Sequence, residues 1–444
     1  MKSEVRLAGL SRRSFLASAA LSSASLALKS KCEAQAAQVD HSQHSHPKPE
    51  RPLVPRLPAL ISKVTATSGI DSAFQMLLEG SDTLDAALHV CKTQEDDPKD
   101  YSAGLGGLPN MQGEVQLDAC CLHGPTRRCA SVASVAGIRN ASGLARVLME
   151  QTDNALLVGS DAHAFAVAHG FTSEDLLTDR SRKTYALWKE IWKKPELLGS
   201  GIYNPLWPES ERKRHFMPDS QLALDSLVSR LEPIARQAGL GPEATWRSAF
   251  DAVSPAAEPV YVSTIDRNGQ ISSACTSSGM PWRMPGASSD VAVVGAGCFV
   301  DPDVGSAGSS GNAAANIKIA GAHTIIENMR MGMSPEEAGL AALRRIVQWC
   351  NSDMTTLRFI EMVYYILRKD GAYGSVSLWR GDRTGHVRQF TISDGEGMRR
   401  TEDCRALFQC SPVNGCPEGS GNLEPERRRS GRVQHDALSG RKSG

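Results

Sequence analysis

The chain lacks the features that mark several large classes of protein. No uncharged apolar run reaches the roughly 18 residues that a membrane-spanning helix needs. Neither sign of charge is in excess, because 49 Lys and Arg residues balance 49 Asp and Glu residues among 444, so the basic surface of a nucleic-acid binder is not expected. With 41% hydrophobic and only 5% aromatic residues, the composition is typical of a soluble globular protein. We expect neither a nucleic-acid nor a membrane partner.

The eleven cysteines do not follow the pattern of a disulfide framework. Their number is odd, they are spread over a long chain, and Cys120 and Cys121 are adjacent. We therefore expect most of them to be buried as small hydrophobic residues. Cys404, Cys410 and Cys416 lie close together and could pair or bind a metal, although their spacing matches no zinc motif. The sequence predicts neither a metal ion nor another cofactor.

The first 36 residues have the pattern of a twin-arginine export signal. Arg12 and Arg13 precede Phe15 and Leu16, a weakly apolar run follows over 17–28, and small residues at 34–36 suit a peptidase. A stretch rich in Pro and His over 37–57 then has the composition of a linker. The pattern predicts a periplasmic or secreted protein that is exported by the twin-arginine route.

The remaining chain divides into two structured halves, at 58–178 and 259–394, joined by a connecting segment at 179–258. The connecting segment is charged, carries scattered Trp and Pro and includes a helical piece at 221–239, and we expect it to be exposed rather than part of a core. After residue 394 the composition becomes polar and basic, which predicts a disordered tail over 395–444. In the first half, amphipathic patterns and caps predict helices at 71–78, 82–92 and 141–150, and alternation predicts a strand at 114–119.

The second half begins with a hairpin signal, because Asn268 and Gly269 separate two alternating runs at 260–265 and 270–275. Ser334, Pro335 and Glu337 form the cap, first position and capping-box residue of a further helix. One helix is expected at 313–331, and strands are expected at 359–367 and 372–379. The two halves together indicate a mixed α/β fold.

Several motifs run in an order and spacing that resembles the glycosylasparaginase family of N-terminal-nucleophile hydrolases, which is close to the isoaspartyl peptidase and asparaginase group. The motifs are Gln94–Pro98, Gly104–Pro109, Leu117–Ala119, Ile138–Asn140 with Ala145–Glu150, Leu157–Gly159, Ala274–Met280 and Gly295–Gly297. Each motif alone is weak, and the two glycines at 295 and 297 lack the third glycine of a dinucleotide-binding loop.

The resemblance implies a four-layer α/β/β/α sandwich and a homodimer. It also implies hydrolysis of the side-chain amide of asparagine, notably the amide that carries the sugar in N-linked glycoasparagine. In the family a precursor cuts itself after a His-Asp pair, and the released N-terminal Thr is the nucleophile while its own α-amine is the base. Counted back from Asp266, these three positions fall on Ala257, Glu258 and Pro259. Proline has no hydroxyl group, so the resemblance implies that the nucleophile position is substituted.

Other family positions are matched one at a time. The second active-site Thr falls on Ser277, which keeps the hydroxyl, and the Asp that holds the α-amine of the substrate falls on Asp290. The Arg that grips the α-carboxylate falls on Ala287, so this clamp is lost. The Thr-Gly pair of the oxyanion hole falls on Ser310 and Gly311, where suitable donors remain.

These residues also allow other interpretations. Ser277 and Ser310 are also suited to tight loops, and Asp290 to a cap. Ser263 or Thr264 could replace the nucleophile, and Arg283 could be a displaced clamp. For function the sequence therefore leaves two hypotheses. The first is an uncut, catalytically impaired family member that binds an amino-acid-like or glycoasparagine ligand, and the alternative is an amidohydrolase with an altered mechanism.

Overall fold

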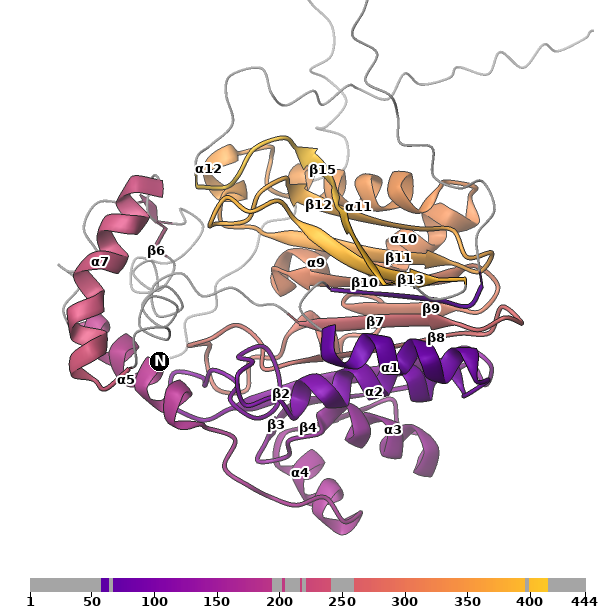
Figure 1. Ribbon diagram of the computed structural model, residues 1–444, viewed down its shortest axis with the longest axis horizontal. Coiled ribbons are helices and arrows are strands. Elements are labelled where there is room, and N and C mark those ends of the chain that lie inside the picture. The colour runs from indigo at the N-terminus through magenta and orange to yellow at the C-terminus, as the bar shows by residue number, and fades with distance from the viewer. Residues whose placement is uncertain are drawn as a thin grey trace, which may run out of the picture. The chain divides into compact units, whose positions relative to one another are not determined.

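A computed structural model describes residues 57–63, 67–193, 202–203, 216–217, 221–240, 259–395 and 399–413. The predicted export signal, the linker up to residue 56, the Ala257 and Glu258 positions and the tail beyond 413 lie outside these residues. The described part of the chain is a mixed α/β structure with two larger sheets, as the alternation of strand and helix signals predicts (Figure 1). None of its helices combines the length and the apolar character needed to cross a membrane.

The larger sheet has eight strands and contains both halves of the sequence. Its order is β14 (Arg400–Asp403), β13 (Gln389–Asp394), β1 (Ala59–Lys63), β7 (Val260–Ile265), β8 (Ile271–Ser277), β2 (Gln116–His123), β3 (Arg128–Ala136) and β4 (Leu156–Val158). All neighbours are antiparallel except β3 and β4. The hairpin predicted around Asn268 and Gly269 is confirmed, because β7 and β8 pair from Val260 with Thr276 to Ile265 with Ile271.

The smaller sheet has five strands from the second half. Its order is β15 (Arg405–Phe408), β12 (Tyr373–Trp379), β11 (Met362–Arg368), β10 (Gly305–Gly311) and β9 (Cys298–Asp301). A separate pair consists of β5 (Ile202–Tyr203) and β6 (Phe216–Met217). The prediction of a disordered tail from residue 395 is wrong for 400–408, because β14 pairs with β13 and β15 pairs in parallel with β12.

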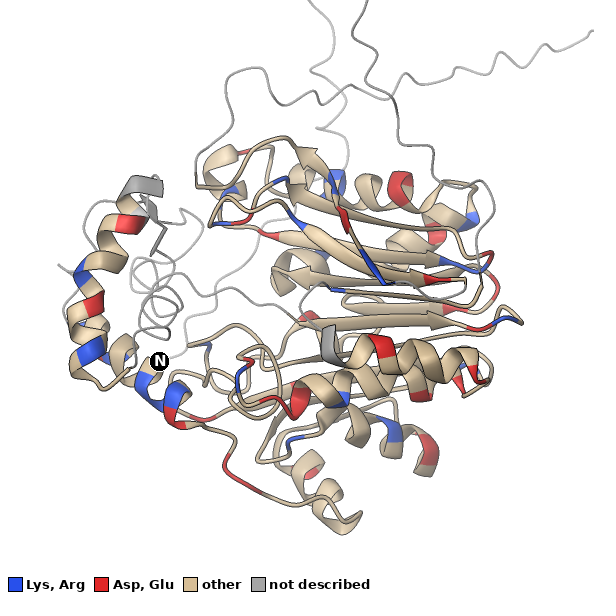
Figure 2. Cartoon of the chain, viewed as in Figure 1, with Lys and Arg blue, Asp and Glu red and all other residues tan. Residues whose placement is uncertain are grey.

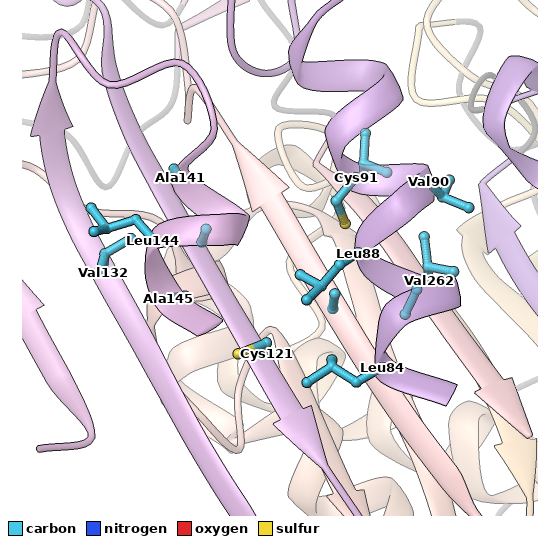
Figure 3. Close-up of a cluster of buried hydrophobic side chains, with 14 of the residues drawn as sticks. Leu84, Leu88, Val90, Cys91, Cys121, Val132, Ala141, Leu144, Ala145 and Val262 are labelled. Atoms are coloured by element: carbon cyan, nitrogen blue, oxygen red, sulfur yellow. The ribbon is translucent and has the colours of Figure 1, made fainter. Parts of the chain in front are cut away.

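Neighbouring residues on a strand separate into different cores, because side chains alternate between the two faces of a sheet. Leu60 and Cys121 belong to the core against the first-half helices, whereas Ile61 and Cys120 belong to a core that also contains Tyr365 of the smaller sheet. The core beneath the helices is drawn in Figure 3. Its helices are α1 (Thr67–Leu78), α2 (Thr83–Glu95), α3 (Ala141–Gln151) and α4 (Gly159–Ala168).

The outer face of the smaller sheet carries its own core. Tyr364 and Ile366 of β11 pack there with residues of α10 and α11. The helices of this region are α9 (Ala313–Ile319), α10 (Gly321–Arg330), α11 (Pro335–Trp349) and α12 (Met354–Leu357). The capping box at Ser334 is confirmed. The single helix expected at 313–331 is wrong, because Ala320 has a left-handed backbone with φ +47° and separates α9 from α10.

The connecting segment is not merely an exposed linker. It forms α5 (Asp179–Lys193) and α7 (Gln221–Gln237), and α7 confirms the helix predicted at 221–239. The apolar faces of the two helices meet in a separate cluster. Trp188 of α5 stacks on Trp282 with ring centroids 5.0 Å apart. The expectation of an exposed segment is therefore wrong for these helices, because each has an apolar stripe that the other covers. Acidic and basic residues are interspersed along their remaining surface (Figure 2).

Candidate active site

The ends of β7, β8 and β2 bring the predicted nucleophile position beside a buried hydroxyl. Pro259 is buried and directly precedes β7, and Val260 pairs with Thr276. One further step of the ladder sets Pro259 opposite Ser277, which in turn pairs with Asp118 of β2. Two positions predicted from the sequence are therefore brought together at one end of the larger sheet.

Ser277 is almost fully buried, and its Oγ accepts a hydrogen bond from the backbone N–H of Gly279 at 2.8 Å. This bond shapes the turn that follows β8. The proposed substitute nucleophiles have other partners: Thr264 Oγ1 donates to the carbonyl of Thr83 at 2.6 Å, and Ser263 lies fully buried inside β7. Neither hydroxyl lies at the end of the strand where Pro259 and Ser277 meet.

Asp290 begins a short 3-10 helix, η3 (Asp290–Ala292), and is buried. Its Oδ2 accepts hydrogen bonds from Ser309 Oγ at 2.8 Å and from Asn316 Nδ2 at 2.6 Å. Tyr364 extends the network by donating its hydroxyl to Asn316 Oδ1 at 2.7 Å. Burial raises the pKa of Asp290, although the bonds from Asn316 and Ser309 act in the opposite direction.

Ser310 and Gly311 end β10, directly after the serine that bonds Asp290. Gly311 has φ +130°, and a Cβ at this position would lie 2.1 Å from the carbonyl oxygen of Glu361. Only glycine suits so close an approach of two backbones. Asn312 follows, donates its backbone N–H to the same carbonyl at 2.7 Å and caps α9. The two positions matched to the family's oxyanion hole therefore directly follow the serine that bonds Asp290.

Ala287 is exposed on the loop between Trp282 and η3. Arg283, the candidate displaced clamp, turns its guanidinium into the protein instead. It donates to the carbonyls of Ser278 at 2.7 Å and Gln116 at 2.8 Å, and its side chain is 8% exposed. Burial lowers the pKa of Arg283, and the charge of Asp118 opposes this. A guanidinium with these partners supports the loop and does not point outward as a displaced clamp would.

Asp118 is a central residue to which sequence reasoning assigned no role. It is fully buried, Oδ1 accepts from the N–H of Ser134 at 2.7 Å, and Oδ2 accepts from the N–H of Ser289 at 2.8 Å. Ser288 adds its hydroxyl at 3.1 Å. The sequence could have indicated this role, because Asp118 is a carboxylate inside an otherwise apolar strand and a buried acid needs specific hydrogen-bond partners.

Glu95 is a second buried acid, and it hydrogen-bonds Thr276, the residue before Ser277 on β8. It is fully buried at the end of α2 and accepts hydrogen bonds from Thr276 Oγ1 at 2.6 Å and from the N–H of Ser142 at 2.9 Å. The predicted cap Asn140 makes no side-chain cap bond, so Glu95 supplies the acceptor at the start of α3. Burial raises the pKa of Glu95 from 4.5 to about 7, while the bonds from Thr276 and Ser142 oppose the rise.

The cysteines of the described residues are mostly free thiols. Among the described residues, no group of three His, Cys, Asp or Glu side chains could hold a metal ion. Cys120, Cys121 and Cys275 are free and buried, in agreement with the expected hydrophobic role. Cys410 forms a disulfide, and Cys404 is free.

Comparisons with known proteins point to one family. The sequence profile of the family described as asparaginase matches residues 61–355. The N(4)-(β-N-acetylglucosaminyl)-L-asparaginase of Elizabethkingia miricola is 30% identical over 74% of this chain and 78% of its own length. A probable isoaspartyl peptidase/L-asparaginase 3 of Arabidopsis thaliana is 26% identical over 66% of this chain and 79% of its own length. The N(4)-(β-N-acetylglucosaminyl)-L-asparaginase of Rattus norvegicus is 26% identical over 66% of this chain and 78% of its own length.

Proposed function

We propose, from the premise that this chain belongs to the asparaginase family, that it is an uncut and catalytically impaired member that binds an amino-acid-like or glycoasparagine ligand. The family reaction is hydrolysis of the asparagine side-chain amide. One observation carries the proposal: Pro259 stands directly before β7, at the position that the family's motif gives to the nucleophile. Proline has neither a hydroxyl to attack the preceding peptide bond nor one to attack a substrate.

The neighbouring positions support the same proposal. Ala287 offers no guanidinium to a substrate carboxylate, and Arg283 is bound to backbone carbonyls. Ser277 and the Ser310–Gly311 pair keep polar groups that can hydrogen-bond a ligand. A ligand can therefore bind at this site although the nucleophile position is substituted. Loss of the nucleophile together with the clamp favours a binding role over hydrolysis of a changed substrate.

The proposed fold is the family's four-layer α/β/β/α sandwich. This proposal is supported by three hydrophobic clusters that alternate with the two sheets. The first lies between the first-half helices and the larger sheet, the second contains residues from both sheets, and the third lies between the smaller sheet and α10 and α11. Alternate residues of single strands contribute to adjacent clusters, as a stack of layers requires.

A denaturing gel and intact-mass measurement of the purified chain test the uncut state. We expect one band and no pair of fragments. Two fragments with a new N-terminus between Ala257 and Thr264 would contradict the match of Pro259 to the nucleophile position. Calorimetric titration with L-asparagine and L-aspartate then tests binding, with release of ammonia or aspartate measured on the same sample.

The alternative function, an amidohydrolase with an altered mechanism, is favoured by the retained hydroxyls of Ser277 and Ser310. It predicts amide hydrolysis by the uncut chain that falls when Ser277→Ala or Ser310→Ala is introduced. Ser229→Ala, at an exposed position on α7, is the control. Substantial hydrolysis that survives both site variants would place the chemistry elsewhere in the chain.

A further inference from the structure

Cysteines from three strands meet in the core that contains residues of both larger sheets. Cys120 of β2 lies directly opposite Cys275 of β8 in the ladder of the larger sheet. Both belong to the same core as Cys298 of β9, which is part of the smaller sheet. The Cys120 thiol forms a hydrogen bond with the Cys298 thiol, and Ser273 Oγ lies 2.9 Å from Cys298 Sγ. Cys120 therefore has two other thiols as neighbours.

These neighbours are placed as disulfide partners would be. Directly opposed residues of an antiparallel pair have Cα atoms about 4.5–5.5 Å apart, within the range of about 4.4–6.8 Å that a disulfide spans. A bond from Cys120 to Cys275 would cross two strands of one sheet, and a bond from Cys120 to Cys298 would join the two sheets. All three cysteines are nevertheless free thiols.

The folded core protects these thiols from oxidants. All three are fully buried, whereas disulfide exchange requires an accessible sulfur atom in its thiolate form. The hydrogen bond with Cys298, together with burial, raises the pKa of Cys120, and burial raises the pKa of Cys275. Once the core has formed, the cluster is therefore unreactive.

Two further thiols lie on the opposite face of β2. Cys121 and Cys91 of α2 belong to the core beneath the first-half helices (Figure 3). Burial raises the pKa of Cys121 to about 12, although a hydrogen bond with the backbone of Ala130 opposes the rise. Cys120 and Cys121 are adjacent in sequence, so an unfolded chain offers both to the same oxidant. A disulfide between thiols of the two different cores would prevent β2 from placing its side chains on their two faces.

Cys410 is in the opposite redox state, because it forms a disulfide. It is half-buried just after β15, where its carbonyl accepts the N–H of Gly381 at 3.2 Å. Among the described residues, the disulfide-bonded cysteine therefore lies outside the core that holds the three neighbouring thiols. Oxidation has reached the periphery of the fold and not this core.

We propose that the chain must fold before it meets an oxidant, because closure of the core prevents Cys120 from exchanging disulfides with its neighbours. In the step that closure prevents, the Cys120 thiolate attacks a small-molecule disulfide and releases one thiol, and Cys275 or Cys298 then displaces the second thiol from the mixed disulfide. The two cysteines lose two electrons and two protons, which the oxidant takes up. This order suits the proposed twin-arginine route, in which a chain folds in a reducing compartment before export.

Refolding of the reduced, urea-unfolded full chain tests this order. One sample refolds in reducing buffer and receives glutathione disulfide afterwards, and the other contains glutathione disulfide from the start. We expect the first sample to recover the native near-ultraviolet circular dichroism, with Cys120, Cys275 and Cys298 still free by alkylation and mass mapping. The second should recover at least about twofold less native chain, because disulfide formation competes with folding. Its trapped chains should contain disulfides of Cys120 or Cys121.

Cys120→Ala combined with Cys121→Ala should restore most of the yield in the oxidising sample. Cys350→Ala is the matched control, because Cys350 is half-buried and belongs to neither of these two cores. Each variant is compared with its own yield in reducing buffer, so that a stability loss from small cavities does not enter the comparison. The proposal is overturned if the unchanged chain refolds equally well in both samples, or if the double variant loses as much yield as the unchanged chain.

Alkylation of the unchanged native chain gives a test that needs no variant. Half-buried Cys350 should react with iodoacetamide well before fully buried Cys120 and Cys275 do. Equal rates, or disulfides of Cys120 that form in the folded chain, would show that the core does not protect its thiols. The ligand site takes no part in these reactions, so their outcome is separate from that of the asparagine titration.

Discussion

The carboxylate of Asp118 accepts the backbone N–H of Ser289 at 2.8 Å and thereby ties the middle of the larger sheet to the segment that begins η3. The same carboxylate accepts the N–H of Ser134 on β3. One buried acid therefore fixes both the loop before Asp290 and the end of β3, where Ser134 has a left-handed backbone with φ +51°. The first prediction concerns this contact.

Asp118→Asn should destabilise the fold strongly. Each carboxylate oxygen of Asp118 accepts a backbone N–H, so the side-chain amide of Asn would have to point its NH2 group at one of these two donors. We expect this to lower the free energy of unfolding by about 2–4 kcal/mol. Urea unfolding monitored by circular dichroism measures the change. Asp303→Asn, which alters an exposed ion pair with Arg127, should leave the midpoint unchanged. Equal stability of the two variants would contradict the central role of Asp118.

The second prediction is a pH dependence of stability from Glu95. Its pKa is raised from 4.5 to about 7 in the folded chain, so between these values the native state binds more protons than the unfolded state. Glu95 therefore adds to the free energy of unfolding in full below about pH 4.5, and this stabilisation is lost as pH rises through 7. The free energy of unfolding changes by about 3 kcal/mol over this range.

Glu95→Gln should therefore flatten the curve of unfolding free energy between pH 5 and pH 8. The control is Glu150→Gln on the exposed face of α3. A steep pH dependence that persists in Glu95→Gln would mean that another group titrates in this range.

The third prediction restores the family residues. Ala257→His, Glu258→Asp and Pro259→Thr rebuild the self-cleavage triplet, and slow self-cleavage should return if Ser277 lies beside position 259. Hydrolysis of asparagine should remain poor without the carboxylate clamp, whose loss costs about 2–5 kcal/mol, or roughly one to four decades in rate.

Adding Ala287→Arg to this triple variant should raise amide hydrolysis much more than self-cleavage. Gel densitometry measures the cleavage, and ammonia release measures hydrolysis. Ala287→Lys is a matched control, because it restores the charge without the bidentate fork. Equal gains in both reactions would argue against a clamp at position 287.

The fourth prediction concerns location, since we propose export by the twin-arginine route. Replacing Arg12 and Arg13 by Lys should keep the protein in the cytoplasm, as cell fractionation would show. Substitution of Lys2 and Arg6 by Gln serves as a control outside the pair. Undiminished export of the paired variant would refute the assignment of the signal.

The fifth prediction is a homodimer of uncut chains, proposed from the family resemblance. Light scattering at micromolar concentration should give twice the mass of the chain. Trp349 is 60% exposed at the end of α11, and its substitution by Lys tests whether that surface is buried in the dimer. A monomer of the unchanged chain would rule the proposal out.

Local chemistry made part of this structure predictable from the sequence. The Asn268–Gly269 turn set the β7–β8 hairpin, and the Ser334 capping box set the start of α11, because both depend on residues at most a few positions apart. The ordered motifs also predicted the family and placed Ser277 near position 259.

Contacts between distant segments decided the rest. The strand β14 has a polar sequence, and both strands of 400–408 form because β13 and β12 offer open edges. Trp188 is buried because Trp282, far away in sequence, stacks on it. Asp118 gained its role in the same way, since a carboxylate in an apolar strand acquires meaning only when tertiary packing determines which donors it meets.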